Sequence, residues 1–119
     1  MAKILIVDDS RTSRKILRNL LEEAGHEIVG EAVNGDEGYL QYRELHPDLV
    51  TMDITMPVTD GLQALQLIRH FDKEAKVVMI TAAGQKEKMV QALKEGAAEF
   101  ITKPFDKEEV VSTINKVVG

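Results

Sequence analysis

The stretch that decides the fold is Lys3-Ile-Leu-Ile-Val7, a short apolar run that leads directly into the acidic pair Asp8-Asp9. Three later runs of mostly apolar residues also end at a polar side chain. They are Asp48–Met52 before Asp53, Lys76–Ile80 before Thr81, and Glu99–Thr102 before Lys103. If the four runs are neighbouring parallel strands, their carboxyl ends share one edge of the sheet, and ligands of open α/β sheets bind at that edge. The sequence therefore predicts that carboxylates, a hydroxyl and an ammonium group converge there.

Amphipathic segments alternate with the apolar runs along the chain. Apolar residues recur at helical spacing in five segments. The predicted helices are 10–24, 36–45, 61–71, 85–95 and 106–118. We expect their apolar residues, Ile16, Val90 and Leu93 among them, to face the core. A further strand, Glu27–Val33, completes five strand–helix units, which predict one α/β domain over residues 1–119 with a parallel sheet covered on both faces.

Composition limits the class of protein. With 119 residues, 44% hydrophobic and 29% charged, the chain has the make-up of one ordinary globular domain. It has no cysteine, no secretory signal after Met1, and no apolar stretch near the roughly 20 residues that cross a bilayer. A net charge of −5 argues against a nucleic-acid partner, because binding to phosphates needs a basic surface. We therefore expect a cytoplasmic protein that binds neither membrane nor nucleic acid.

The acidic residues at the strand ends are candidate metal ligands. The adjacent charges of Asp8 and Asp9 repel one another, and a cation such as Mg²⁺, which prefers oxygen ligands, would relieve that repulsion. Asp53 ends a run where a carboxylate without a partner is costly, and it can also act as a nucleophile toward a phosphoryl group. The alternatives are structural. Asp9 can cap the following helix, and Asp53 can form a turn, although Pro57 and Gly61 already supply turn residues.

Thr81 and Lys103 are weaker signals when each is taken alone. Threonine is common in strands, and a lysine at a strand end is often a solvated surface residue. At the shared sheet edge, however, Lys103 can pair with a phosphoryl oxygen or a carboxylate, and Thr81 offers a hydroxyl. The set as a whole suits a divalent cation together with a phosphoryl group.

The ordered set of motifs resembles the receiver domain of two-component response regulators, especially the stand-alone CheY-type chemotaxis receivers. The matching stretches are Ile4–Asp9, Val50–Pro57 through Asp60-Gly61, Thr81-Ala82, and Gly96-Ala97 through Phe100–Phe105. The resemblance covers the chain from end to end, and its motifs are correctly spaced and jointly specific. It implies a flavodoxin-like (βα)5 fold, which is a doubly wound parallel sheet with strand order 2-1-3-4-5.

The resemblance also implies the ligands of a metal and the site of modification. Asp53 is similar to the phosphoacceptor of the family. One Mg²⁺ per chain is implied, and its ligands would be Asp8, Asp9, Asp53 and the backbone carbonyl of Thr55.

A second group of residues resembles the switch of the family. Thr81 is similar to the hydroxyl that moves toward the phosphoryl group, and Lys103 to the salt-bridge partner of that group. The resemblance implies a cis peptide bond before Pro104, which turns Lys103 into the site. Phe100 occupies the switch-aromatic position, where chemotaxis receivers often have tyrosine. Gly38 stands where the family often has alanine, and we expect it to cost about 1 kcal/mol of helix stability.

The function implied by the resemblance is two-component signalling, most simply in chemotaxis. A histidine kinase would donate the phosphoryl group of a phosphohistidine to Asp53, and the modified chain would switch its binding to a downstream target such as a flagellar motor switch protein. The chain would promote its own phosphorylation and dephosphorylation without being an enzyme. A phosphatase is a further expected partner, and the expected state is a monomer. A phosphorelay receiver and a receiver excised from a longer regulator remain alternatives.

Three other functions fit parts of the pattern. A flavodoxin-like flavin binder shares the fold class, but Val7–Arg11 would repel a phosphate without a metal. A small metal-dependent phosphatase with an aspartyl nucleophile usually carries an Asp-x-Asp pattern after its first strand, and the adjacent Asp8-Asp9 has the wrong spacing. A pseudo-receiver that serves only as a binding scaffold is disfavoured, because all five of the residues that carry the chemistry are retained.

Overall fold

The computed structural model describes residues 1–119 and contains one parallel sheet of five strands. The strands are β1 (Lys3–Val7), β2 (Glu27–Ala32), β3 (Leu49–Asp53), β4 (Val77–Thr81) and β5 (Glu99–Thr102). Their order in the sheet is β2-β1-β3-β4-β5, and each neighbouring pair is parallel. The strand order implied by the resemblance is therefore confirmed.

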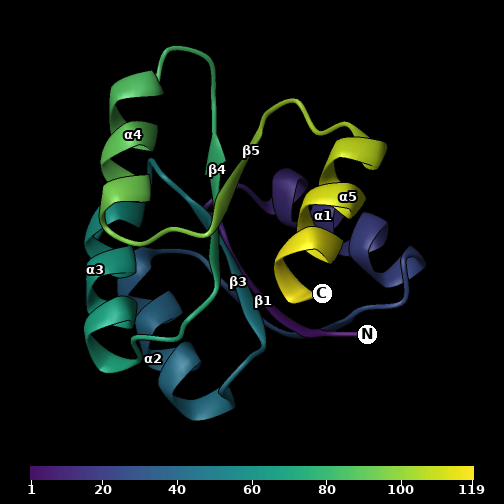
Figure 1. Ribbon diagram of the computed structural model, residues 1–119, viewed down its shortest axis with the longest axis horizontal. Coiled ribbons are helices and arrows are strands. Elements are labelled where there is room, and N and C mark those ends of the chain that lie inside the picture. Colours follow the sequence, from purple (N-terminus) through teal and green to yellow (C-terminus); the bar gives the residue numbers. More distant parts are fainter.

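Five helices connect the strands and cover both faces of the sheet (Figure 1). They are α1 (Arg11–Glu23), α2 (Gly35–Leu45), α3 (Gly61–Phe71), α4 (Lys86–Lys94) and α5 (Lys107–Val118). Helices α2, α3 and α4 lie on one face, and α1 and α5 lie on the other. Leu5 and Val7 of β1 belong to the core cluster on the first face, whereas Ile4 and Ile6 belong to the cluster on the second. This burial on both faces explains why the strands are continuous apolar runs.

Side-chain caps set the first residues of the helices. Helix α1 begins one residue later than predicted because Ser10 is its N-cap, whose hydroxyl accepts a hydrogen bond from the Ser13 amide at 3.2 Å. Helix α5 begins at Lys107, and Asp106 is its N-cap, which accepts a hydrogen bond from the Glu109 amide at 3.0 Å. None of the helices, of which the longest has 13 residues, is long and apolar enough to cross a membrane.

The expectation that Ile16, Val90 and Leu93 face the core is wrong. Ile16 is 45% exposed, and Val90 and Leu93 are each 41% exposed. Helix α4 packs on the sheet through the fully buried Ala92. At 3.6 residues per turn, Leu93 lies about 100° and Val90 about 160° around the helix from Ala92, so neither can reach the core. The small alanine brings the helix close to the sheet and leaves the larger side chains outside.

Gly38 has a packing role that its helix propensity does not reveal. It is buried on α2, and a Cβ atom at this position would lie 2.9 Å from both γ-methyl carbons of Val7. Such contacts are shorter than real Cβ atoms make. Glycine therefore lowers the helix propensity of α2, but it also allows a close approach between α2 and β1 that alanine would disturb.

Candidate functional site

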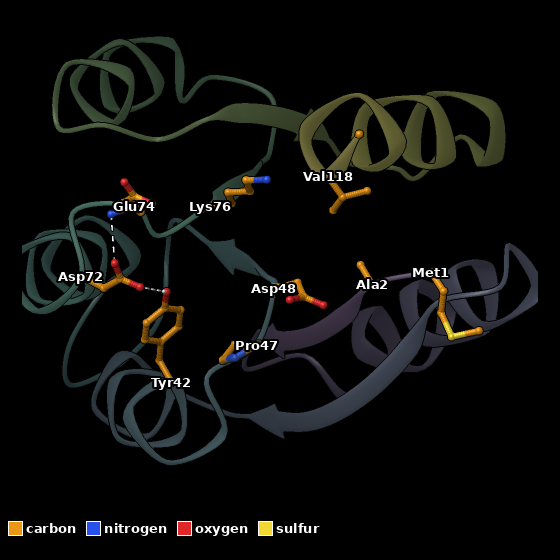
Figure 2. A pocket seen from close by; sticks show the side chains of 10 residues that line it. Met1, Ala2, Tyr42, Pro47, Asp48, Asp72, Glu74, Lys76 and Val118 are labelled. Atoms are coloured by element: carbon orange, nitrogen blue, oxygen red, sulfur yellow. Dashed lines mark hydrogen bonds between the residues drawn. The ribbon is translucent and has the colours of Figure 1, made fainter.

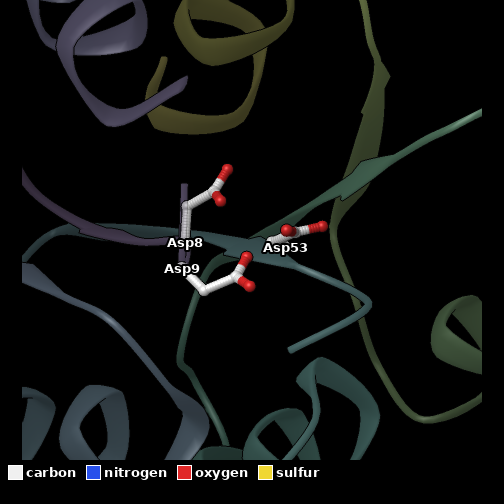
Figure 3. Close-up of side chains that lie close together, drawn as sticks. All are labelled: Asp8, Asp9 and Asp53. Atoms are coloured by element: carbon white, nitrogen blue, oxygen red, sulfur yellow. The ribbon is translucent and has the colours of Figure 1, made fainter. Parts of the chain in front are cut away.

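Three carboxylates meet at the carboxyl ends of β1 and β3, as the sequence predicts. One carboxylate oxygen from each of Asp8, Asp9 and Asp53 lies within 4.8 Å of the others (Figure 3). Asp8 and Asp53 are only 2% and 8% exposed, whereas Asp9 is open to solvent. The cluster therefore has a buried floor and one accessible side through which a ligand can enter.

The turn after β1 holds Asp8 in place. Its Oδ1 accepts a hydrogen bond from the Ser10 amide at 2.8 Å, and its own amide donates to the Ala32 carbonyl of β2 at 3.0 Å. Since Ser10 is the residue that caps α1, Asp9 does not cap the helix. The structural alternative for Asp9 is thereby excluded, and its carboxylate is free to face Asp53.

Arg14 supports this turn from helix α1, and sequence reasoning missed it. Its Nη1 donates to the Asp8 carbonyl at 2.8 Å, while its Nε donates to Glu31 Oε1 on β2 at 3.0 Å. Arg18 pairs with the same glutamate. Burial raises the pKa of the Glu31 carboxyl, but the hydrogen bonds from Arg18 and Arg14 outweigh that effect and hold it below its usual value. No local motif links Arg14 to Asp8, so only the folded chain reveals the contact.

The loop after Asp53 folds back tightly over the end of β3. The Gly61 amide donates to the Ile54 carbonyl at 2.8 Å, and a Cβ at Gly61 would lie 2.1 Å from the Asp53 carbonyl oxygen. Only glycine fits this approach. Within the same loop, Val58 has a φ of 67° and is 82% exposed, which is a strained backbone conformation for a β-branched residue.

Lys103 points into the acidic cluster, so it is not a solvated surface residue. Its Nζ lies 3.0 Å from Asp8 Oδ2 and 3.6 Å from Asp53 Oδ2. The Lys103-Pro104 peptide bond is cis, as the resemblance implied. The Lys103 amide also donates to the Thr81 carbonyl at 2.7 Å, which joins the ends of β5 and β4 beside the carboxylates.

The surroundings of Asp53 disfavour its charge. Burial raises the pKa of its carboxyl to about 6, and the nearby charge of Asp8 adds to the rise, whereas Lys103 opposes it. One ammonium group faces three carboxylates, so the cluster keeps an excess of negative charge. A hard divalent cation that prefers oxygen ligands would complete the neutralisation, and the donor set therefore fits Mg²⁺.

The remaining predicted residues surround the cluster at different depths. Thr81 is buried at the end of β4, one residue beyond the position that pairs with Asp53 in the sheet. Thr55 is exposed in the loop that follows β3. Phe100 on β5 is half-buried and packs against the core cluster on the face of α2, α3 and α4. All of the predicted residues except Phe100 lie at or directly beyond the carboxyl ends of the strands.

Gln85 is a second residue that sequence reasoning missed, because the helical pattern marks it only as the start of a helix. Its Oε1 accepts a hydrogen bond from the Ala82 amide at 2.7 Å, and its Nε2 donates to the hydroxyl of Thr55. The side chain therefore joins the β3–α3 loop to the β4–α4 loop, which are the loops that follow Asp53 and Thr81.

A separate hollow of about 500 Å³ lies at the opposite, amino-terminal edge of the sheet (Figure 2). Residues from both ends of the chain line it, among them Met1, Ala2 and Val118. At its side the Tyr42 hydroxyl donates to Asp72 Oδ2 at 2.7 Å. Burial and this hydrogen bond raise the pKa of Tyr42, and the same bond lowers that of Asp72. The hollow shares no residue with the acidic cluster.

Comparisons with known proteins agree with this geometry. The family model for the response regulator receiver domain matches residues 4–115. The chain is 45% identical to Chemotaxis protein CheY of Thermotoga maritima, over 97% of this chain and 96% of that protein. It is also 45% identical to Protein CcdB of Bacillus subtilis, over 100% of this chain and 99% of that protein. Among solved structures, a chain of the CheX-CheY-BeF3-Mg²⁺ complex from Borrelia burgdorferi superimposes with a TM-score of 0.92 at 39% identity, over 98% of this chain and 89% of that one.

The family model covers residues 4–115 of this chain, and the matches to the relative and to the solved structure run over most of both chains. They exclude the interpretation as a flavin binder, which rested on the fold class alone. The chain therefore belongs to the response regulator receiver domain family and is a signalling switch of two-component systems.

Proposed function

We propose that Asp53 accepts a phosphoryl group from a phosphohistidine of a partner histidine kinase. The observation that carries this proposal is the convergence of Asp8, Asp9 and Lys103 on Asp53 at one edge of the sheet. Of the three carboxylates, Asp53 is the one that ends β3, the middle strand of the sheet, and its Oδ2 lies 3.6 Å from Lys103 Nζ. It therefore has a nucleophilic oxygen and neighbours suited to neutralise the charge that phosphoryl transfer brings.

In the proposed step an oxygen of the Asp53 carboxylate attacks phosphorus, while the bond from phosphorus to the histidine nitrogen breaks. The electron pair of that bond returns to the imidazole, which then takes up a proton, and an acyl phosphate forms on Asp53. Lys103 stabilises the phosphoryl oxygens with its ammonium group. Asp8, Asp9, Asp53 and the backbone carbonyl of Thr55 would hold one Mg²⁺, which when bound neutralises further charge on the phosphoryl oxygens.

The switch proposed for the modified chain uses Thr81 and Phe100. The buried Thr81 hydroxyl lies at the end of the strand next to Asp53 and is placed to donate a hydrogen bond to a phosphoryl oxygen. Its movement would vacate space that the half-buried ring of Phe100 can fill, and Phe100 has no hydroxyl whose burial would be costly. Partner affinity would then change with the populations of the two arrangements.

We assign the pathway to chemotaxis, with a downstream target such as a flagellar motor switch protein and with a separate phosphatase. Relatives named Chemotaxis protein CheY support this assignment, and the solved complex from Borrelia burgdorferi pairs the CheY of that organism with CheX. The relatives do not all carry that name: one from Bacillus subtilis is Protein CcdB, whereas another from the same organism is Chemotaxis protein CheY, so a phosphorelay is kept as the second candidate. A monomer that works in the cytoplasm fits either pathway.

Mass spectrometry tests the central claim. Acetyl phosphate with Mg²⁺ should modify the wild type, and borohydride should trap the acyl phosphate at Asp53. Asp53→Asn keeps the shape but removes the nucleophile, so it should not react, whereas the exposed control Asp36→Asn should react normally. A trapped label on another residue would refute the assignment. The pathway is then tested by comparing the proteins that beryllofluoride-loaded wild type and Asp53→Asn capture from native cell extract.

A further inference from the structure

The side chain of Gln85 makes two hydrogen bonds across the mouth of the acidic site, and together they are called the tie. Its carboxamide oxygen accepts from the Ala82 amide at 2.7 Å, and its carboxamide nitrogen donates to the Thr55 hydroxyl. Ala82 directly follows the buried Thr81, and Thr55 lies two residues after Asp53. One side chain therefore bridges the residue next to the switch hydroxyl and the loop next to the phosphoacceptor.

The short loop between β4 and α4 has few hydrogen bonds of its own. Residues 82–84 are small and exposed, and the bond from the Ala82 amide to Gln85 is the only hydrogen bond they make. Gly84 has a φ of 87°, a left-handed conformation that turns the chain so that the Gln85 side chain can reach back over the loop. Gln85 is the N-cap of α4, yet its side chain makes no cap hydrogen bond to that helix. Its two side-chain bonds serve the loops instead.

We infer that Gln85 is a positioning residue. It holds the β4–α4 loop in the position that the loop has without a phosphoryl group, and so opposes the movement of Thr81 toward a phosphoryl group on Asp53. This inference rests on the proposed function for its consequence. If the Thr81 hydroxyl approaches a phosphoryl group on Asp53 through a shift of the Thr81–Ala82 backbone, that shift works against the tie, which anchors Ala82 to the loop on the other side of the site. Removal of the tie lowers the cost of that shift and favours the phosphorylated arrangement.

The size of the effect follows from the bonds that are lost. The two bonds of Gln85 act in series, so the loop is released when one of them breaks. One net hydrogen bond contributes about 1 kcal/mol, which is about five-fold in an equilibrium constant. Gln85→Met keeps the length and helix propensity of the side chain but removes both polar atoms. We expect it to bind beryllofluoride with Mg²⁺ about five-fold more tightly than the wild type and to be phosphorylated faster by acetyl phosphate. Gln91→Met, at an exposed position of the same helix, is the matched control and should leave both values unchanged.

Hydrogen exchange detects the tie without any phosphoryl group. With metal chelated, the Ala82 amide should exchange several-fold faster in Gln85→Met than in Gln91→Met. Thr55→Val removes the other end of the tie but leaves the Thr55 backbone carbonyl in place. It should shift beryllofluoride affinity in the same direction, and the double variant Thr55→Val with Gln85→Met should add nothing beyond Gln85→Met. Thr55→Val also provides the test if Gln85→Met does not fold.

The outcomes separate the inference from the proposed function. Equal Ala82 exchange in Gln85→Met and Gln91→Met would show that the tie does not protect the loop. Faster exchange with unchanged beryllofluoride affinity and unchanged phosphorylation rate would overturn the positioning role. A wild type that neither binds beryllofluoride nor takes the phosphoryl group would overturn the proposed function and the role together, while the exchange result would still decide whether the tie exists.

Discussion

Replacing Asp53 by asparagine should stabilise the fold at neutral pH while abolishing phosphorylation. The carboxyl of Asp53 is buried beside Asp8, and its pKa is raised from 3.8 to about 6. Its folded-state pKa is thus above its unfolded value, so the folded protein binds more protons than the unfolded chain between about pH 4 and pH 6. The free energy of unfolding therefore falls as pH rises through that window. Asparagine has a similar shape and no charge, so it removes this penalty.

The magnitude follows from the shift in pKa. A difference of one pKa unit corresponds to 1.36 kcal/mol, so ionised Asp53 lowers the stability of the metal-free protein by about 3 kcal/mol above pH 7. Asp53→Asn should gain up to this amount at pH 7 and almost nothing at pH 4, where the wild type is already protonated. Lys103 keeps its 3.0 Å contact with Asp8 in the variant, so no ammonium group is left unpaired.

Urea unfolding followed by circular dichroism measures this gain directly. Wild type, Asp53→Asn and the exposed control Glu44→Gln should be compared at pH 4 and pH 7, first in chelator and then in millimolar Mg²⁺. Mg²⁺ should stabilise the wild type more than Asp53→Asn and so narrow the difference. The reasoning is refuted if Asp53→Asn is no more stable than wild type at pH 7 in chelator, or if its advantage is as large at pH 4.

The remaining predictions concern the same site and the packing around it. Mg²⁺ affinity, followed by amide NMR shifts, should fall steeply below about pH 6 because the cation must displace the proton of Asp53; a flat profile would contradict its role as a ligand. Gly38→Ala should lower the free energy of unfolding by about 1 kcal/mol, since the clash with Val7 outweighs the gain in helix propensity, and a stabilised variant would disprove the packing argument. Val58→Asn should raise the free energy of unfolding by about 1 kcal/mol, measured as a higher melting temperature, because asparagine tolerates a positive φ. No gain would mean that the backbone is not strained at this position.

Much of the site was predictable because its functional side chains lie at, or directly after, the carboxyl end of an apolar strand. The apolar run Lys3–Val7 is continuous since both faces of the sheet are covered, and Asp8, Asp53 and Lys103 stand where three such runs stop. Parallel topology then places the three at one edge of the sheet. The resemblance added the strand order and the cis peptide bond, which the pattern of residues alone does not determine.

The contacts that escaped prediction join residues that are distant in sequence or depend on the depth at which a helix sits. Arg14 reaches the Asp8 carbonyl around the start of α1, and Gln85 reaches Thr55 across the mouth of the site. Exposure of Val90 depends on which face of α4 meets the sheet, and helical spacing alone cannot choose between two apolar stripes. These features arise from tertiary placement, so periodicity carries no signal for them.

The first and last residues lie near one another at the amino-terminal edge of the sheet, which makes this fold suitable for circular permutation. Met1, Ala2 and Val118 line one hollow, and His26 binds both ends, since its Nδ1 accepts from the Ala2 amide at 3.0 Å and its Nε2 contacts Asn115 Oδ1 at 2.9 Å. A short linker could therefore close the chain into a ring, with new ends opened at an exposed turn elsewhere. Such a circular permutant, or a reporter fused at either end, would leave the whole carboxyl edge of the sheet untouched. The order in which the strands and helices are connected can thus be changed without changing the acidic site at the carboxyl edge of the sheet.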